Sequence, residues 1–193
     1  MSQSEGIIKF KCNWNKTELI DAGCLADLIH YRNLLFTKKL IGCDDDGIGY
    51  GNISCRHLGN TFFISGSATG DVKHFSKKHI SLVTDFNIGL NNLHCSGPVK
   101  ASSESLSHAV IYHQKPEVNA VIHIHHKIFW EKYLNKLPTT SPLVEYGTPE
   151  MAVEISKLLD KDHGIIIMGG HEDGIICYGT DMHQAFELVE RLY

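Results

Sequence analysis

The sequence lacks the features that mark membrane-spanning or nucleic-acid-binding proteins. Its longest apolar stretches, such as residues 164–170, are much shorter than the roughly 20 apolar residues that a membrane-spanning helix requires. The 18 Lys and Arg residues are outnumbered by 22 Asp and Glu residues, so the net charge of -4 includes no basic excess for a nucleic acid. We therefore expect neither a membrane nor a nucleic acid as a partner.

The chain also lacks the closely spaced cysteine pairs of zinc ribbons. Its six cysteines are scattered, without any C-x-x-C pair, and we expect them to be buried free thiols. The first residues contain neither the cationic region nor the apolar segment of a secretory signal peptide. These features favour a cytoplasmic protein.

Histidine, by contrast, is abundant, with 13 residues in a chain of 193. The length suits a single domain with a hydrophobic core, and 42% hydrophobic with 21% charged residues is typical of globular proteins. We find no repeat or linker that divides the chain, so residues 1–193 are predicted to form one domain. The histidines therefore need an explanation within one ordinary globular fold.

Hydrophobic periodicity predicts a domain that combines helices and strands. Helices are expected within residues 16–40, 102–114 and 149–159 and from Asp181 onward, with Ser102 or Ser103 capping the second of them. Strands are expected at residues 52–57, 61–65, 80–86, 118–125, 164–168 and 175–178, with a hairpin turn at residues 58–60. We predict an α/β domain whose mostly antiparallel sheet is covered by helices.

One predicted strand carries two histidines that could bind a metal together. His123 and His125 are two residues apart, so their side chains project from the same face of a strand, whereas His126 faces the other way. His171, on a glycine-flanked loop between two apolar strands, is the preferred third ligand, and His163 is its rival. Three protein ligands with an open position are typical of a catalytic zinc site.

Other polar residues could act beside such a metal. Glu104 follows two serines at the start of a predicted helix, where it could transfer protons or simply complement the helix dipole. Two glycine-rich stretches, residues 49–54 and 65–70, border predicted strands and could bind a phosphate or carboxylate through backbone amides.

The order of these motifs resembles the class II aldolase/adducin family, which includes fuculose- and rhamnulose-phosphate aldolases and ribulose-phosphate 4-epimerase. The resemblance is carried by G-N-I-S-C-R at residues 51–56, F-I-S-G-S at 63–67, S-S-E at 102–104 with His108 and Tyr112, V-I-H-I-H at 121–125, and Gly170-His171. It extends from about Thr17 to near the C-terminus. The ordered set is specific, whereas each motif alone is common.

The resemblance implies a three-layer α/β/α sandwich and a metal-dependent lyase. It implies Zn2+ or another divalent metal bound by His123, His125 and His171, with Glu104 as the general acid/base. The substrate would be a small hydroxy-carbonyl compound, namely a sugar phosphate, that reacts through an enediolate. Its phosphate would be bound by Asn52, Ser65, Gly66, Ser102 and Ser103. Four-fold tetramers are typical of the family, so the resemblance also implies a homo-oligomer.

The chain departs from the family pattern in several places. Residues 126–144 are shorter than the corresponding family segment, which supplies a tyrosine acid, and neither Tyr133 nor Tyr146 can be assigned that role. Glu172 and Asp173 separate His171 from the next glycine. An extra residue in the second glycine-rich stretch leaves Ser67 or Thr69-Gly70 as alternative phosphate ligands, and Gly49 stands where a hydroxyl residue is common.

Two other functions are compatible with this pattern. An epimerase or a dehydratase of a sugar phosphate would use the same metal and acid/base group. An adducin-like binding module would keep the fold without catalysis, but the retained histidines and Glu104 favour an enzyme.

Overall fold

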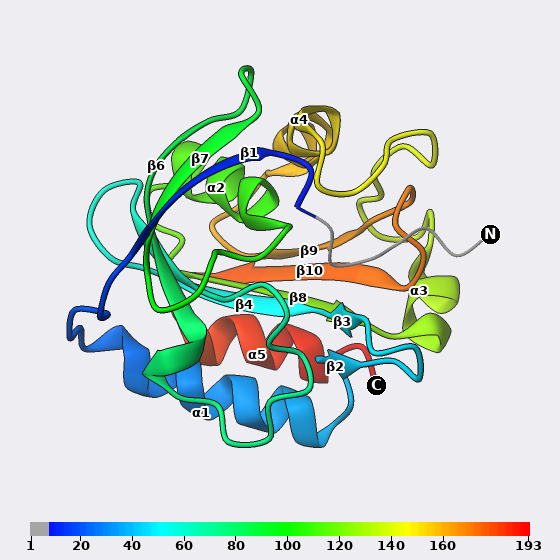
Figure 1. Cartoon of the computed structure of the whole chain (residues 1–193). Coiled ribbons are helices and arrows are strands. Elements are labelled where there is room, and N and C mark those ends of the chain that lie inside the picture. The colour runs from blue at the N-terminus through cyan, green and yellow to red at the C-terminus, as the bar shows by residue number, and fades with distance from the viewer. Residues whose placement is uncertain (1–7) are drawn as a thin grey trace.

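A sheet of eight strands forms the centre of the computed structural model, which describes residues 8–193 (Figure 1). In spatial order the strands are β1 (Lys11–Lys16), β7 (Asn92–Gly97), β6 (Ile80–Asn87), β5 (Phe62–Ser65), β4 (Asn52–Arg56), β8 (Ala120–His125), β10 (Gly174–Gly179) and β9 (Gly164–Ile167). Neighbouring strands are antiparallel except for β1 and β7, which are parallel. The mostly antiparallel sheet predicted from the sequence is therefore confirmed.

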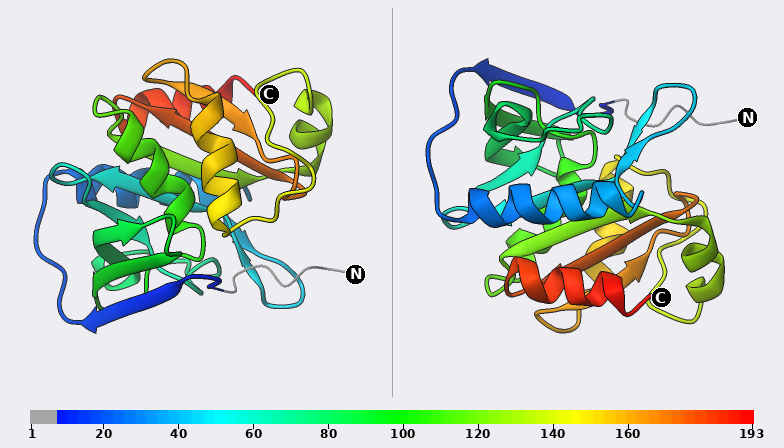
Figure 2. Two further views of the ribbon diagram at one scale, coloured as in Figure 1. Left: turned by 90° about the horizontal axis from the view of Figure 1, so that it is seen from above. Right: turned by 90° about the horizontal axis from the view of Figure 1, so that it is seen from below.

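Helices cover both faces of this sheet. Figure 2 shows α2 (Ser105–Gln114) and α4 (Pro149–Leu158) from above, and α1 (Cys24–Thr37) and α5 (Met182–Glu190) from below. A short helix, α3 (Lys127–Tyr133), follows β8, a 3-10 turn spans Lys77–His79, and β2 (Gly42–Cys43) pairs with β3 (Gly49–Tyr50) in a small second sheet. The arrangement confirms the three-layer sandwich.

The alternation of side chains in β8 divides the hydrophobic core into two halves. Ala120, Ile122 and Ile124 pack with α1 and α5 on one side of the sheet. Val121 packs on the other side, in the cluster that contains α2 and α4. His123 lies two residues after Val121, so the strand places an imidazole on the α2 and α4 side.

Several predicted boundaries are wrong. The helix expected within residues 16–40 begins only at Cys24. Lys16 instead belongs to strand β1, which it ends. Ser102 and Ser103 do not occupy the position before α2; Glu104 does, and its side chain makes no capping hydrogen bond. Strands β1 and β7 and helix α3 were not predicted.

Other local predictions are confirmed. The turn at residues 58–60 joins β4 to β5 through a hydrogen bond from Thr61 N to Leu58 O (3.0 Å). Asp181 caps α5 by accepting a hydrogen bond from Gln184 N (2.8 Å). All six cysteines are free thiols, and Cys55, Cys95 and Cys177 are buried. Cys12, Cys24 and Cys43 are only half-buried, so the expected burial is confirmed for three of the six thiols.

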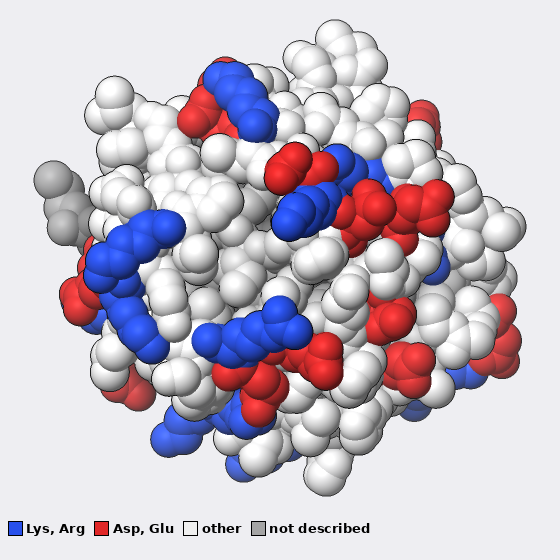
Figure 3. Space-filling view, turned by 180° about the vertical axis from the view of Figure 1, so that it is seen from behind, with Lys and Arg blue, Asp and Glu red and all other residues white. Residues whose placement is uncertain are grey.

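The surface carries charges of both signs. On the face shown in Figure 3, Lys and Arg side chains lie beside Asp and Glu side chains rather than forming a patch of one sign. Among residues 8–193, no helix combines the length and apolar character needed to cross a membrane.

The packing of β8 predicts a large difference between two isoleucines. Ile122 is fully buried in the core, whereas Ile128 on α3 is 69% exposed. We expect Ile122→Ala to lower the free energy of unfolding by about 2–5 kcal/mol, because it leaves a cavity. Ile128→Ala should change it by about 0.5 kcal/mol or less. Urea denaturation of both variants measures the difference, and equal losses would contradict the assigned register of β8.

Candidate metal centre

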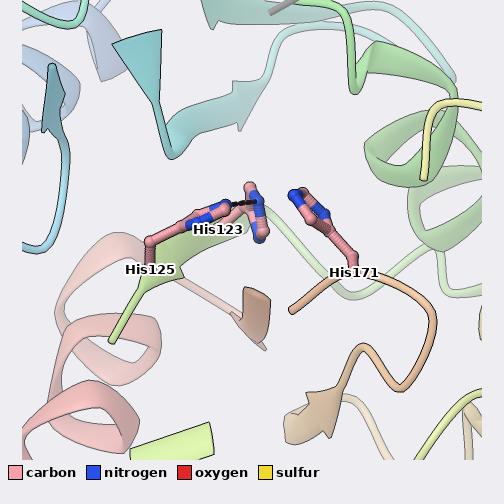
Figure 4. A group of neighbouring side chains, drawn as sticks. All are labelled: His123, His125 and His171. Atoms are coloured by element: carbon pink, nitrogen blue, oxygen red, sulfur yellow. Dashed lines mark hydrogen bonds between the residues drawn. The ribbon is translucent and has the colours of Figure 1, made fainter. Parts of the chain in front are cut away.

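Three histidines from two parts of the chain meet at one end of the central strands. His123 and His125 project from the same face of β8, and His171 comes from the loop between β9 and β10 (Figure 4). One ring nitrogen from each histidine lies within 4.8 Å of the other two. The Nε2 atoms of His123 and His125 are 3.0 Å apart. This cluster can bind one metal ion.

Glycines allow the His171 loop to lie close to its neighbours. A side chain at Gly170 would place its Cβ 1.9 Å from the carbonyl oxygen of Val144. At Gly174, a Cβ would lie 3.1 Å from the rings of both His123 and His171. The loop itself is closed by a hydrogen bond from His171 N to Met168 O (3.1 Å). The insertion of Glu172 and Asp173 therefore does not prevent His171 from reaching the cluster.

The other two histidines considered with this cluster lie elsewhere. His163 is exposed and precedes β9, so the structure brings His171 rather than its rival to the cluster. His126 caps α3 by accepting a hydrogen bond from Phe129 N (3.2 Å), and its ring stacks on that of Phe129. His126 therefore has the structural role expected for a residue on the opposite face of β8.

Hydrogen bonding and burial prepare His123 to act as a ligand. Its Nδ1 lies 3.2 Å from the carbonyl oxygen of Ile175. A carbonyl can only accept, so Nδ1 carries the proton and Nε2 presents its lone pair to the cluster. Burial lowers the pKa of His123 to about 3, which keeps the imidazole neutral at physiological pH.

The carboxylate of Glu104 lies between two of these histidines. Its Oε2 is 3.3 Å from His123 Nε2, and its Oε1 is 3.1 Å from His171 Nδ1. Burial opposes the charged form, but the imidazoles of His123 and His171 outweigh burial and lower the pKa of Glu104 to about 2. Because the side chain faces the histidines and makes no capping bond, its contacts are those of a site residue rather than a helix cap.

A buried hydrogen-bond network supports the start of α2. Ser54 Oγ on β4 lies 2.7 Å from His108 Nδ1 and 2.7 Å from the hydroxyl of Tyr112. Both partners are on α2, and His108 is one turn after Glu104. The network fixes β4 against α2, and thereby fixes Asn52 relative to Glu104.

The predicted phosphate-binding residues line the same pocket as the histidines. Asn52, Ser65, Gly66, Ser102 and Ser103 all border it, and so do both alternatives, Ser67 and Thr69-Gly70. The Oδ1 of Asn52 is buried and accepts no hydrogen bond from the described chain. By contrast, Ser65 Oγ already accepts one from Ile53 N (3.2 Å). The structure thus brings the whole predicted set together, although Ser65 also holds the neighbouring strand.

The two tyrosines that the sequence left undecided lie in different places. Tyr146 lines the pocket, and its ring stacks on His171 with centroids 4.3 Å apart. Lys9 Nζ lies 3.9 Å from the centroid of the Tyr146 ring. The hydroxyl of Tyr133 instead donates to Leu192 O (3.2 Å). The contacts of Lys9 could not be predicted, because it is 137 residues from Tyr146 in the chain.

Comparison with known proteins supports the family resemblance over part of the chain. Residues 43–129 match the family model of the class II aldolase and adducin N-terminal domain. A curated L-fuculose phosphate aldolase from Methanocaldococcus jannaschii is 28% identical over 110 residues, which cover 48% of this chain. The match spans 57% of the length of that relative. Residues 43–129 therefore match the class II aldolase/adducin family, the family that their motifs resemble.

Solved structures share the fold over most of the chain. An L-fuculose 1-phosphate aldolase has a TM-score of 0.68 at 20% identity, covering 90% of this chain and 83% of its own. A sugar-phosphate aldolase from Thermotoga maritima has a TM-score of 0.68 at 17% identity, covering 88% of this chain and 90% of its own. A Klebsiella pneumoniae protein, provisionally described as an aldolase/epimerase/decarboxylase, has a TM-score of 0.67 at 14% identity, covering 88% and 84%. At these identities the likeness concerns the fold.

The geometry of the cluster predicts metal binding that depends on each of the three histidines. The chelator-treated protein should take up one Zn2+ per chain, measured by titration calorimetry and by metal analysis after dialysis. His123→Ala, His125→Ala and His171→Ala should each weaken Zn2+ binding by about 100-fold or more, because even loss of a residue that only orients a ligand costs about 10- to 100-fold.

His163→Ala is the matched control, because this exposed histidine was the rival ligand. It should bind Zn2+ as the unmodified protein does. If the unmodified protein is folded and takes up no Zn2+, or if His163→Ala alone loses it, the assigned centre is wrong.

Proposed function

We propose that the protein is a metal-dependent, class II aldolase-like lyase that cleaves or forms a C–C bond in a small sugar phosphate. The observation that carries this proposal is the buried carboxylate of Glu104, held 3.1–3.3 Å from two of three clustered imidazoles. A purely structural interior has no need for such a set, because burying a carboxylate is costly. Perturbed, clustered ionisable groups in a pocket are typical of active sites.

The donor set fits a divalent metal, with zinc as the first choice. His123, His125 and His171 each offer one ring nitrogen, and the family resemblance supports the same three ligands. When bound, the metal would polarise the carbonyl and hydroxyl oxygens of the substrate and stabilise the negative charge of an enediolate.

Glu104 would move the proton in this reaction. Its low pKa keeps it ionised, so a carboxylate oxygen can accept a proton from a substrate hydroxyl as the C–C bond breaks. Only 3% of Glu104 is exposed, so bulk water does not compete for that proton. The same group would return the proton to complete the turnover.

The other side of the pocket would bind the phosphate. Ser102 and Ser103 lie directly before Glu104, and residues 65–70 border the pocket from the β5 side. Hydroxyls and backbone amides are good donors to a phosphate, and the unsatisfied Oδ1 of Asn52 could accept a substrate hydroxyl.

One observation favours an epimerase or dehydratase as a second candidate. Within the described chain, no residue from 126–144 lines the pocket. The hydroxyl of Tyr133 donates a hydrogen bond to Leu192 O instead. A reaction that moves a proton or loses water could use Glu104 without a tyrosine from that segment. The assembly into a four-fold homo-oligomer and the cytoplasmic location stay predictions.

The role of Glu104 predicts a variant that loses activity and keeps its metal. L-fuculose 1-phosphate and related sugar phosphates should be assayed with Zn2+-loaded protein for aldehyde release, isomerised product and loss of water. We expect Glu104→Gln to lower the rate by about 100- to 10,000-fold, because the amide cannot accept the proton.

Glu117→Gln provides the control, because Glu117 is exposed. It should retain both the rate and the zinc content. Full activity of Glu104→Gln would exclude the acid/base role, and a zinc-loaded protein that acts on none of these substrates would favour the adducin-like binding module.

A further inference from the structure

A buried arginine on α1 contacts the glycine-rich loop of the pocket. Arg32 is 1% exposed, and its Cζ lies 4.7 Å from the centroid of the Phe36 ring and 4.6 Å from that of the Phe75 ring. Its Nη2 donates to Thr69 O (2.8 Å) and Gly70 O (3.0 Å), and its Nη1 donates to Val72 O. Arg32 therefore holds three carbonyl groups of one short loop.

The charge of Arg32 is not balanced by an ion pair. No carboxylate in the described part of the chain lies within ion-pair distance of its guanidinium. Burial lowers the pKa of Arg32 to about 10, partly offset by the exposed Asp71, so the group stays protonated at neutral pH. An unpaired buried cation is costly. An anion in the adjoining pocket would compensate for that cost.

The loop that Arg32 holds presents open backbone donors. In a trans peptide the C=O and the following N–H point in opposite directions, so the amides of Gly70 and Asp71 point away from the guanidinium. Neither amide has an acceptor among the described residues. The loop is fixed further by Thr69 Oγ1, which donates to Gly66 O (2.8 Å). Such a fixed loop with free amides suits an anion.

We propose that Arg32 is a positioning and specificity residue for the anionic end of the substrate. It orients residues 69–72 so that the amides of Gly70 and Asp71 are available to a phosphate, and it supplies the positive charge that favours an anion over a neutral group. Arg32 itself borders the pocket together with Thr69 and Gly70. This proposal rests on the phosphate end of the proposed function and is independent of the metal ligands.

Inorganic phosphate is the probe for this role, with binding measured by titration calorimetry on the full, metal-free chain. Arg32→Gln should weaken phosphate binding by about 10- to 100-fold, because a charged donor that fixes several acceptors is lost. Arg32→Lys keeps the positive charge but lacks the planar guanidinium with its several fixed donors. It should therefore recover part of the affinity for phosphate. Zn2+ binding should be unchanged in both variants. With a sugar phosphate that the protein converts, the Arg32 substitutions should mainly raise KM.

Arg56→Gln is the matched control. Arg56 also donates to several carbonyls, including Val118 O (2.7 Å) and Tyr112 O (2.9 Å), and stacks on an aromatic ring, but it does not border the pocket. It should destabilise the fold and leave phosphate affinity within about twofold. The proposal is overturned if Arg32→Gln binds phosphate as the unmodified protein does, or if Arg56→Gln loses as much affinity. It is also overturned if the unmodified protein binds Zn2+ but no phosphate, a result that leaves the metal centre intact.

Discussion

The buried carboxylate of Glu104 imposes the strictest constraint on this fold. A carboxylate that is 3% exposed must be compensated, and in residues 8–193 the side chains within 3.3 Å of its oxygens are His123 and His171. These partners come from β8 and from the loop before β10, while Glu104 itself precedes α2. The sheet and the helix layer above it must therefore pack in one register for the site to exist. A shift of β8 by one residue would turn both of its paired histidines toward α1 and α5.

Hydrogen bonds within the protein hold the polar side chains around this site, and two of these side chains are held by backbone carbonyls. His123 is oriented by Ile175 O, and Arg32 by three loop carbonyls, so neither depends on a mobile surface partner. Hydrogen bonds among the side chains of Ser54, His108 and Tyr112 join β4 to α2. Burial lowers the pKa of His108 to about 4, which keeps that ring neutral. A site supported in this way is already organised before a ligand arrives, which reduces the cost of binding.

The sequence predicted the parts of the fold that follow a simple periodicity. Alternation along β8 was sufficient to place His123 and His125 together, because its other face is wholly apolar. Strands β1 and β7 were missed because Asn13, Asn15, His94 and Ser96 make them polar, as expected near a sheet edge. The start of α1 was misplaced because spaced leucines show a helical face and not its first residue. Arg32 was missed because a single arginine within a helix is usually solvated, and only the packing of Phe36 and Phe75 reveals its burial.

The two ends of the pocket have opposite electrostatic preferences, and this contrast limits the kind of substrate that suits it. Three clustered imidazoles beside an ionised Glu104 favour a cation, whereas the open amides held by a charged Arg32 favour an anion. A neutral sugar would satisfy neither end fully. A metal ion at the histidines together with an anionic group at the loop would satisfy both, and a compound with a carbonyl at one end and a phosphate at the other could contact the two at once. The charge distribution therefore favours a ligand whose anionic group lies at the loop while its other end contacts a metal at the histidines, which is compatible with the proposed sugar phosphate.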